Sequence, residues 1–509
     1  AIREFLAGIL STPGEGSLLV SGGIYDRDAS ISKVIDAAAD KVGASFAGQP
    51  QDEASVRMIL SGAYWHAGRY EACEREAQRA YVIRRERLGE RDLRTLAALQ
   101  RAAEALREQG KLAEAASRFR QLRDEYERQL GSTDPRLLAV RGNVVLMLAE
   151  QPEQFRDSQE FVNTTIQIQR EVMGPEALLT RQTQAAYAKA LLSLGKLKEA
   201  EQIAKQTMHG NWPQSHRSLW DCFVTLGGVA EQRGELEKAE QIYKEALNRQ
   251  SQFGGDEHPF TYELRYALSR VLIFQGRYAE AEVLSKKNVE LMQREWGDSN
   301  AKKLSWNLGN LAWALQRQQK IAEATLVHRQ RVELTQRALG KDHVETLQAR
   351  NSLAWCLWED GQANEAKPIA QSAVDGFRRV QQQPSLVMLN ALDTLAVILR
   401  DTGDLEQAEG LFQEMTILWQ QLHEDGTPFN PEPQLHYGEC LLKMKRYDQA
   451  EPMLLASYRA FQKSVGEKDP DTQSALSRLV ELYEAMGRND RAEEYRALQA
   501  AAKSGNGPR

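Results

Sequence analysis

One phrase of the sequence returns about every 42 residues along most of the chain. It reads Gly-x-hydrophobic-x-Glu-Ala-Glu or a close variant, as at 195–201, 276–282 and 403–409. Eleven copies start at positions 68, 110, 153, 195, 234, 276, 319, 361, 403, 445 and 487, and those at 153, 319 and 445 lack the glycine. A fixed period of this length indicates a repeat architecture, in which stacked copies of one small unit bury a continuous core.

Two columns of small side chains accompany the phrase. The position five residues after each start holds Ala in most copies, and the position seven residues before it holds mostly Ser, Ala or Gly. Leucines four residues apart recur beside the second column. Small side chains at fixed places let two helices cross closely, and leucines at this spacing form one apolar helix face. Each repeat is therefore predicted to be a pair of helices joined by a short turn.

Charge and composition argue against several classes of function. The chain has 65 Lys and Arg against 71 Asp and Glu, so it lacks the basic surface that binds nucleic-acid phosphates. No stretch approaches the roughly 18 apolar residues of a membrane span. The histidines show no metal-ligand spacing, and no set of Ser, His and Asp indicates a nucleophile. We predict that the chain is not an enzyme, with no catalytic residue, metal, cofactor or nucleic-acid partner.

The four cysteines, Cys73, Cys222, Cys356 and Cys440, lie far apart in the sequence. Each falls in an apolar helical context, and no CxxC pair occurs. Free cysteine in such a context behaves as a small hydrophobic side chain. We expect four buried thiols.

The repeat resembles the tetratricopeptide repeat, in the 42-residue form of kinesin light chains and their bacterial relatives. The linkers at 253–261, 339–347 and 465–472 match that family's Gly-x-x-His-Pro-x-Thr pattern. In such a linker, glycine ends one helix and Asp or His before Pro starts the next. The resemblance implies an all-α fold, a right-handed superhelical solenoid of about eleven helical hairpins over residues 53–503.

The remaining segments depart from the repeat. We predict a short helix and a glycine-rich loop over 1–29, a capping helix over 30–52 with Ser30 as its N-cap, and a disordered tail over 504–509. A homodimer contact is the alternative role of the capping helix. Inside the solenoid, irregularities are expected near 150–160 and 209–216. The three prolines of 424–433 predict a long linker.

A second resemblance concerns the amino terminus. The order of Phe5-Leu6, a glycine-rich spacer, the segment 31–38 and Gly68-Arg69-Tyr70 is similar to the region after the kinase domain and membrane span in certain bacterial serine/threonine protein kinases. None of the kinase's own motifs is present. The resemblance implies the regulatory or sensory carboxy-terminal part of a membrane-bound kinase, tethered to the membrane. A free-standing chain would instead be cytoplasmic, and the start at Ala1 fits a fragment of a longer protein.

The candidate binding residues come from the first helix of each pair, which lines the inner groove in the resembled family. They are Arg270, Trp306, Trp313, Arg317, Asn351, Trp355, Trp358, Asn390 and Arg400. Tryptophan and arginine most often dominate binding energy. An asparagine can serve a peptide group as donor and acceptor together, and the resemblance implies this role for Asn351. The alternative is that the tryptophans, Trp306 above all, only pack between helices.

Together these observations predict a non-enzymatic scaffold that holds a peptide or protein partner in its concave groove. We expect the partner to present an aromatic or acidic side chain to the repeats that start at 319 and 361. The kinase-regulatory role is the alternative function.

Overall fold

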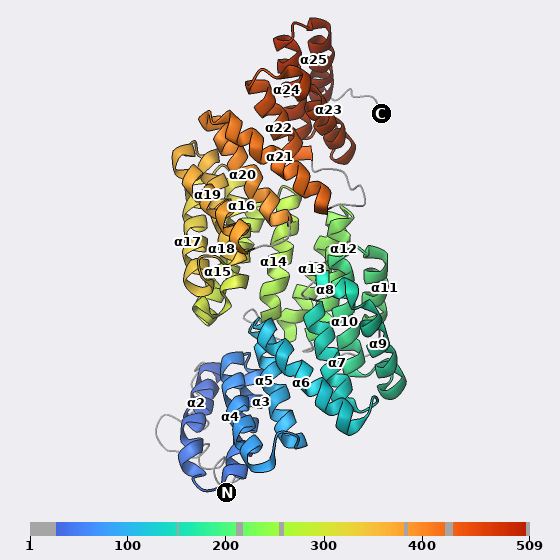
Figure 1. Cartoon of the computed structure of the whole chain (residues 1–509), viewed down its shortest axis with the longest axis vertical. Coiled ribbons are helices and arrows are strands. Elements are labelled where there is room, and N and C mark those ends of the chain that lie inside the picture. Colours follow the sequence, from blue (N-terminus) through green and yellow to red (C-terminus); the bar gives the residue numbers. More distant parts are fainter. Residues whose placement is uncertain are drawn as a thin grey trace. The chain divides into compact units, whose positions relative to one another are not determined.

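The computed structural model describes residues 27–149, 152–209, 217–253, 259–380, 385–422 and 431–504. Every regular element in these ranges is a helix (Figure 1), so the all-α prediction is confirmed. The predicted helix at 1–10, most of the glycine-rich loop, the irregular segment 210–216 and the last five residues lie outside the described ranges. The chain divides into two compact units, residues 1–253 and 254–509.

The first unit starts with α2 (Arg27–Ser45), and five helix pairs follow it in its described part. The pairs are α3 (Pro50–His66) with α4 (Tyr70–Leu88), α5 (Leu93–Glu108) with α6 (Leu112–Leu130), α7 (Pro135–Leu148) with α8 (Pro152–Asp157) and α9 (Gln159–Met173), α10 (Leu178–Ser193) with α11 (Leu197–Met208), and α12 (Arg217–Gln232) with α13 (Leu236–Phe253).

The described part of the second unit contains six helix pairs and one 3₁₀ turn, η2 (Gly297–Asn300). The pairs are α14 (Pro259–Phe274) with α15 (Tyr278–Trp296), α16 (Ala301–Arg317) with α17 (Ile321–Leu339), α18 (Val344–Glu359) with α19 (Ala363–Val380), α20 (Leu386–Thr402) with α21 (Leu405–Leu422), α22 (Pro431–Lys443) with α23 (Tyr447–Ser464), and α24 (Pro470–Ala485) with α25 (Asn489–Ser504). Within each unit, a pair contacts the pairs that precede and follow it. The handedness of the superhelix stays a prediction.

The small-residue columns form the helix crossings. The small residues that lie five positions after each phrase start, from Cys73 to Ala492, are completely buried except for Ser158. The facing column is equally tight, because a Cβ atom on Gly438 would lie 2.5 Å from Leu454 Cδ2. Two helix backbones therefore approach each other at the same place in successive pairs, and this requirement explains the fixed period.

The turn of each pair depends on one residue with a left-handed backbone. The glycines that begin the phrase have positive φ angles, for example 92° at Gly403. Two of the three copies without glycine keep the same turn, with φ of 63° at Gln319 and 61° at Lys445. The turn geometry therefore persists where the glycine has been lost, at the steric cost that side chains have in this region.

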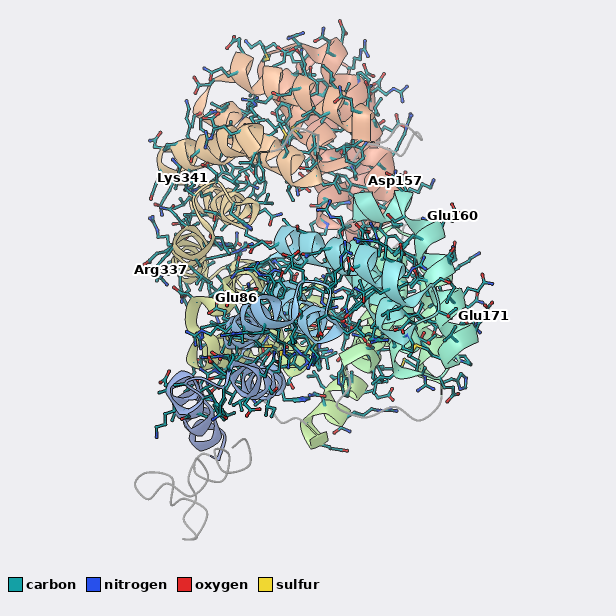
Figure 2. All side chains as sticks on the ribbon, turned by 60° about the horizontal axis from the view of Figure 1, so that its bottom comes forward. Glu86, Asp157, Glu160, Glu171, Arg337 and Lys341 are labelled. Carbon is teal, nitrogen blue, oxygen red and sulfur yellow. The ribbon has the colours of Figure 1, made fainter. Side chains whose placement is uncertain are left out.

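The last glutamate of the phrase joins neighbouring pairs. Glu409 contacts Arg446 at 2.6 Å, and Glu282 contacts Lys320 at 2.8 Å. In both cases the base follows the start of the next copy by one residue. Other charged side chains, such as Glu86 and Arg337, lie exposed on the surface (Figure 2). Partly exposed ion pairs contribute little each to stability.

The linkers between pairs have the predicted capping geometry. The side chain of Asp469 accepts a hydrogen bond from the backbone N–H of Asp471, and His343 Nδ1 accepts one from that of Glu345. The linker threonine closes the loop, since Thr346 Oγ1 donates to the carbonyl of Gly340 at 2.8 Å. Helices α18 and α24 thus begin at places that their own linker residues determine.

Helix α2 covers the free face of the first pair. Its Ala38 and Val42 are buried with residues of α3, and Asp36 accepts a 2.7 Å hydrogen bond from the Tyr64 hydroxyl. The helix begins at Arg27 and ends at Ser45, so Ser30 lies inside the helix and its prediction as the N-cap is wrong. The apolar face of α2 is used within the chain, as a cap requires.

The second helix of the third pair is split into α8 and α9 at Ser158, within the segment 150–160 where an irregularity was predicted. Two further segments differ from the predicted boundaries. Residues 431–433 were predicted as linker but form the first turn of α22, because proline is tolerated where the backbone N–H has no helical partner. Helix α25 reaches Ser504, one residue into the predicted tail. None of the described helices combines the length and the apolar composition that crossing a bilayer requires.

Candidate functional site

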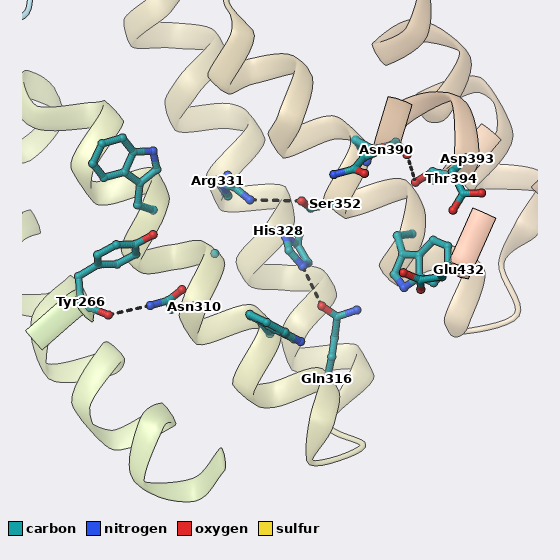
Figure 3. A pocket seen from close by; sticks show the side chains of 15 residues that line it. Tyr266, Asn310, Gln316, His328, Arg331, Ser352, Asn390, Asp393, Thr394 and Glu432 are labelled. Atoms are coloured by element: carbon teal, nitrogen blue, oxygen red, sulfur yellow. Dashed lines mark hydrogen bonds between the residues drawn. The ribbon is translucent and has the colours of Figure 1, made fainter. Parts of the chain in front are cut away.

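A cavity of about 450 Å³ lies in the second unit and is lined by five successive pairs. The first helices α14, α16, α18, α20 and α22 supply most of its wall, and the second helix α17 supplies two residues (Figure 3). The lining residues are Tyr266, Trp306, Gly309, Asn310, Trp313, Gln316, His328, Arg331, Asn351, Ser352, Trp355, Asn390, Asp393, Thr394 and Glu432. The wall therefore combines aromatic rings, side-chain amides and charged groups.

Five of the nine predicted binding residues lie on this wall, namely Trp306, Trp313, Asn351, Trp355 and Asn390. They come from α16, α18 and α20, so the repeat period places them on corresponding faces of neighbouring pairs. Trp313 is 38 % exposed and meets the ring of Phe274 edge to face at 5.4 Å.

The indole rings are held by carboxylates of the chain itself. Trp306 Nε1 donates to Glu345 at 3.0 Å, and Trp355 Nε1 donates to Glu359 at 3.1 Å. The N–H groups are therefore used within the chain, while both side chains remain partly exposed at the cavity wall. A fixed ring loses little conformational entropy when it is covered, which favours binding.

Trp358 lies behind Trp355 rather than on the cavity wall. The two ring centroids are 4.7 Å apart, and Trp358 Nε1 donates to Asp401 at 3.1 Å. Both rings also pack against the core between α18 and α20. Trp358 therefore supports the position of Trp355.

Two asparagines on the wall differ in their bonding. Asn310 Nδ2 donates to the Tyr266 carbonyl at 3.1 Å and to Ser269 Oγ at 2.7 Å, so it ties α16 to α14 (Figure 3). The Oδ1 atom of Asn351 is buried and has no hydrogen-bond partner in the described part of the chain. Asn310 is a structural residue, whereas the amide of Asn351 is available.

The three predicted arginines lie outside the cavity. Arg400 is buried and pairs with Asp401 at 2.9 Å and with Glu439, so its charge is used inside the protein. The Arg317 guanidinium lies over the Tyr278 ring, and that of Arg270 lies over the Tyr266 ring. Arg270 lies over a ring of its own helix, whereas Arg317 and Arg400 face side chains of neighbouring pairs. The binding role of all three stays a prediction.

The cavity also contains two residues of α17 that sequence reasoning missed, His328 and Arg331. The prediction considered first helices only. A signal was present in the sequence, because the next pair holds Ala370 and Ala373 at the corresponding places. A histidine and an arginine at places where the next pair has alanine could have marked this pair as different.

The opposite end of the cavity is acidic. Asp393 and Glu432 lie on the wall, and His436 Nδ1 is 3.0 Å from both Asp393 oxygens. Burial alone would lower the pKa of His436, but the Asp393 carboxylate raises it above its ordinary value. Burial raises the pKa of Glu432. The ring of His436 is also 6.2 Å from that of Trp355, although α18 and α22 belong to pairs that are two places apart.

The cysteines are buried and free, as predicted. Burial raises the pKa of the Cys440 thiol to about 11. A thiol in this state is a poor nucleophile and a poor metal ligand.

Comparisons with known proteins identify the family. Tetratricopeptide-repeat models match residues 54–79, 222–294, 304–379, 388–429 and 432–496, which is more than half of the chain. The chain therefore belongs to the tetratricopeptide-repeat family, and this prediction is confirmed. No curated protein matches the chain.

Solved structures with a similar fold are known. The apo form of RapI is 11 % identical, with a TM-score of 0.51 over 72 % of this chain and 98 % of its own. The apo quorum sensor NprR of B. thuringiensis is 14 % identical, with a TM-score of 0.52 over 72 % of this chain and 97 % of its own. A kinesin light chain of P. anserina, with nearly identical TPR-like repeats, is 20 % identical over 41 % of this chain and 98 % of its own, with a TM-score of 0.36. The resemblance to kinase-associated repeats stays a prediction.

Proposed function

We propose that the chain is a non-catalytic interaction scaffold whose second-unit cavity binds an extended peptide segment of a partner protein. The amide of Asn351 carries this proposal, since its buried oxygen has no partner in the described part of the chain. Buried polar atoms are nearly always hydrogen-bonded in native proteins. An extended peptide offers the backbone N–H and C=O groups that such an amide binds.

The aromatic wall supports the same proposal. Trp306, Trp313 and Trp355 lie on successive first helices, and carboxylates hold two of the three rings. Rings spaced along one surface suit the side chains of an extended segment, which project at regular intervals. The cavity thus offers apolar contact area together with a polar group that fixes the backbone.

The first experiment selects ligands with the full chain. Random twelve-residue peptides displayed on phage are the probe, and selected peptides are titrated by calorimetry. The double variant Trp355→Ala/Trp358→Ala should lose at least about 30-fold in affinity, since buried tryptophans dominate binding energies. Trp65→Ala is the matched control, because it removes an indole from α3 in the first unit. Unchanged affinity of the double variant would refute the proposal.

A pair of asparagine variants separates binding from folding. Asn351→Leu keeps the side-chain shape and removes an unpaired buried oxygen, so we expect about tenfold weaker peptide binding without loss of thermal stability. Asn310→Leu removes two hydrogen bonds between α16 and α14 and should lower the melting temperature. Equal behaviour of the two variants in binding and in thermal denaturation would contradict the assignment of Asn351.

A further inference from the structure

Arg331 is a buried cation on the cavity wall. Its side chain projects from α17 and is 8 % exposed. The Nε atom donates to Ser305 Oγ at 2.9 Å, and Nη1 donates to Ser352 Oγ at 3.3 Å (Figure 3). Both acceptors are neutral hydroxyl groups. A guanidinium has five N–H donors, so these bonds leave donors for a further acceptor.

The charge of Arg331 is not compensated by an ion pair. No carboxylate lies within ion-pairing distance of its guanidinium among the described residues. Glu345, which is also buried, acts on it from a greater distance. One oxygen of that carboxylate accepts from Trp306, and the other has no hydrogen-bond partner in the described part of the chain. Burial lowers the pKa of Arg331 in spite of Glu345. Buried charges in proteins are normally paired, so this one indicates a missing anionic partner.

The sequence is adapted locally to this guanidinium. Gly309 faces it, and a Cβ atom at that place would lie 3.3 Å from Nη1 of Arg331. Glycine inside a helix costs about 1 kcal/mol relative to alanine. The next pair holds Asn351 and Ala373 at the places of Gly309 and Arg331. The arginine and the space beside it therefore occur together in this pair.

The rest of the α17 wall adds no second positive charge. His328 is buried, and its Nε2 lies 3.1 Å from Gln316 Oε1. Burial, followed by the Arg331 charge, lowers the pKa of His328 to about 3. At neutral pH the imidazole is uncharged, and this part of the cavity carries the single positive charge of Arg331.

We propose that Arg331 forms a subsite that binds one carboxylate of the peptide ligand. This inference rests on the proposed function and adds the chemical class that the peptide must contain. One guanidinium balances one negative charge and can donate two parallel N–H bonds to the two carboxylate oxygens. A phosphate dianion would leave one negative charge uncompensated in a buried site. The carboxylate comes from an Asp or Glu side chain or from a peptide carboxy terminus.

The test begins with the peptides selected on the full chain. Each is compared with its Glu→Gln or Asp→Asn form and with its C-terminal amide, which separates the two sources of the carboxylate. We expect one of these changes to weaken binding to the wild-type chain at least about tenfold, because a charge-assisted bond to a buried group is lost. The same change in the peptide should alter its affinity for the Arg331→Met variant by less than about twofold. Arg329→Met, on the exposed side of α17, is the control and should behave like the wild type.

A second arm needs no peptide. Thermal unfolding is measured with monomethyl glutarate or inorganic phosphate, in chloride of matched ionic strength. The monocarboxylate should raise the melting temperature of the wild-type chain and not that of Arg331→Met, and phosphate should raise it less. Without ligand, Arg331→Met should melt no lower than the wild type, because it removes an uncompensated buried charge. If the Arg331→Met variant does not fold, the Arg331→Gln variant is used in its place.

The outcomes distinguish the two proposals. If no peptide is selected but the monocarboxylate protects only chains with Arg331, the peptide function fails and the carboxylate subsite stands. If peptides bind Arg331→Met as tightly as the wild type, or without any carboxylate, the subsite is refuted and the peptide function stands. The carboxylate subsite would also be refuted if phosphate raised the melting temperature more than the monocarboxylate did. It would likewise be refuted if no peptide were selected and the monocarboxylate had no effect on the melting temperature.

Discussion

Two histidines beside the same cavity titrate in opposite directions. Burial alone would lower the pKa of His436, yet the contact with Asp393 raises it, with smaller effects from Arg400 and Glu432. Burial lowers the pKa of His328 to about 3, and Arg331 adds to that effect. One imidazole therefore favours the protonated form in the folded state, and the other favours the neutral form.

This difference predicts opposite pH dependences. The stabilisation from His436 is complete below the unfolded pKa of about 6.5 and is lost as the pH rises through the raised folded value. His436→Gln should therefore lower the free energy of unfolding more at pH 6 than at pH 9. His328 resists protonation when folded, so its contribution is lost as the pH falls below about 6.5, and His328→Gln should reduce acid destabilisation between pH 7 and 5. Urea unfolding at these pH values measures both effects, and parallel profiles would contradict the assignment.

The placement of single residues shows where sequence reasoning succeeded. Trp313 and Trp355 lie on the cavity wall because repeat position alone decides which face of a first helix they occupy. Arg400 is used in a pair with Glu439, and Arg331 enters the cavity from a second helix. The placement of Arg400 depends on a partner 39 residues away, and that of Arg331 depends on the space beside a glycine. Neither placement follows from the repeat period.

At the scale of the element, the turn of each pair is the feature that the sequence determines most directly. Its left-handed residue is glycine in most copies and lysine at position 445, where φ is 61°. The helix pairs, their boundaries within a few residues and the small-residue crossings could be predicted, because each depends on neighbours in the same repeat. The first turn of α22 could not, because three prolines indicate a linker unless the helix start is known.

The turn supplies a second prediction. Lys445→Gly should raise the free energy of unfolding by about 1 kcal/mol, because the strain of a side chain in the left-handed region is removed. Gly403→Ala should lower it by a similar amount, since φ there is 92° and no atom lies near the added methyl group. Chemical denaturation of the full chain measures both changes. If Lys445→Gly lowered the free energy of unfolding, contacts of the lysine side chain would outweigh the strain of the left-handed turn.

At the scale of the whole molecule, stability should be local, because the helices of each pair within a unit pack mainly against those of the pairs beside it. Gly438→Ala would place a methyl group 2.5 Å from Leu454 Cδ2 at the crossing of α22 and α23. We expect a loss of about 1–3 kcal/mol from overpacking. Hydrogen exchange should show reduced protection in α20–α25 and unchanged protection in α3–α6.

The control for this prediction is Gly410→Ala in α21, where no atom lies within 4 Å of the added methyl group. It should stabilise the helix, since alanine has the higher helix propensity. A uniform loss of protection along the chain in Gly438→Ala would mean that the two units unfold as one cooperative body, contrary to nearest-neighbour behaviour.

The contact between Trp355 and His436 has a mechanical consequence. These rings pack against each other although they belong to pairs two places apart, so they bridge the intervening pair that contains α20. A ligand that entered between the two rings would therefore separate α18 from α22, and a force that pulled these two helices apart would break the same ring contact.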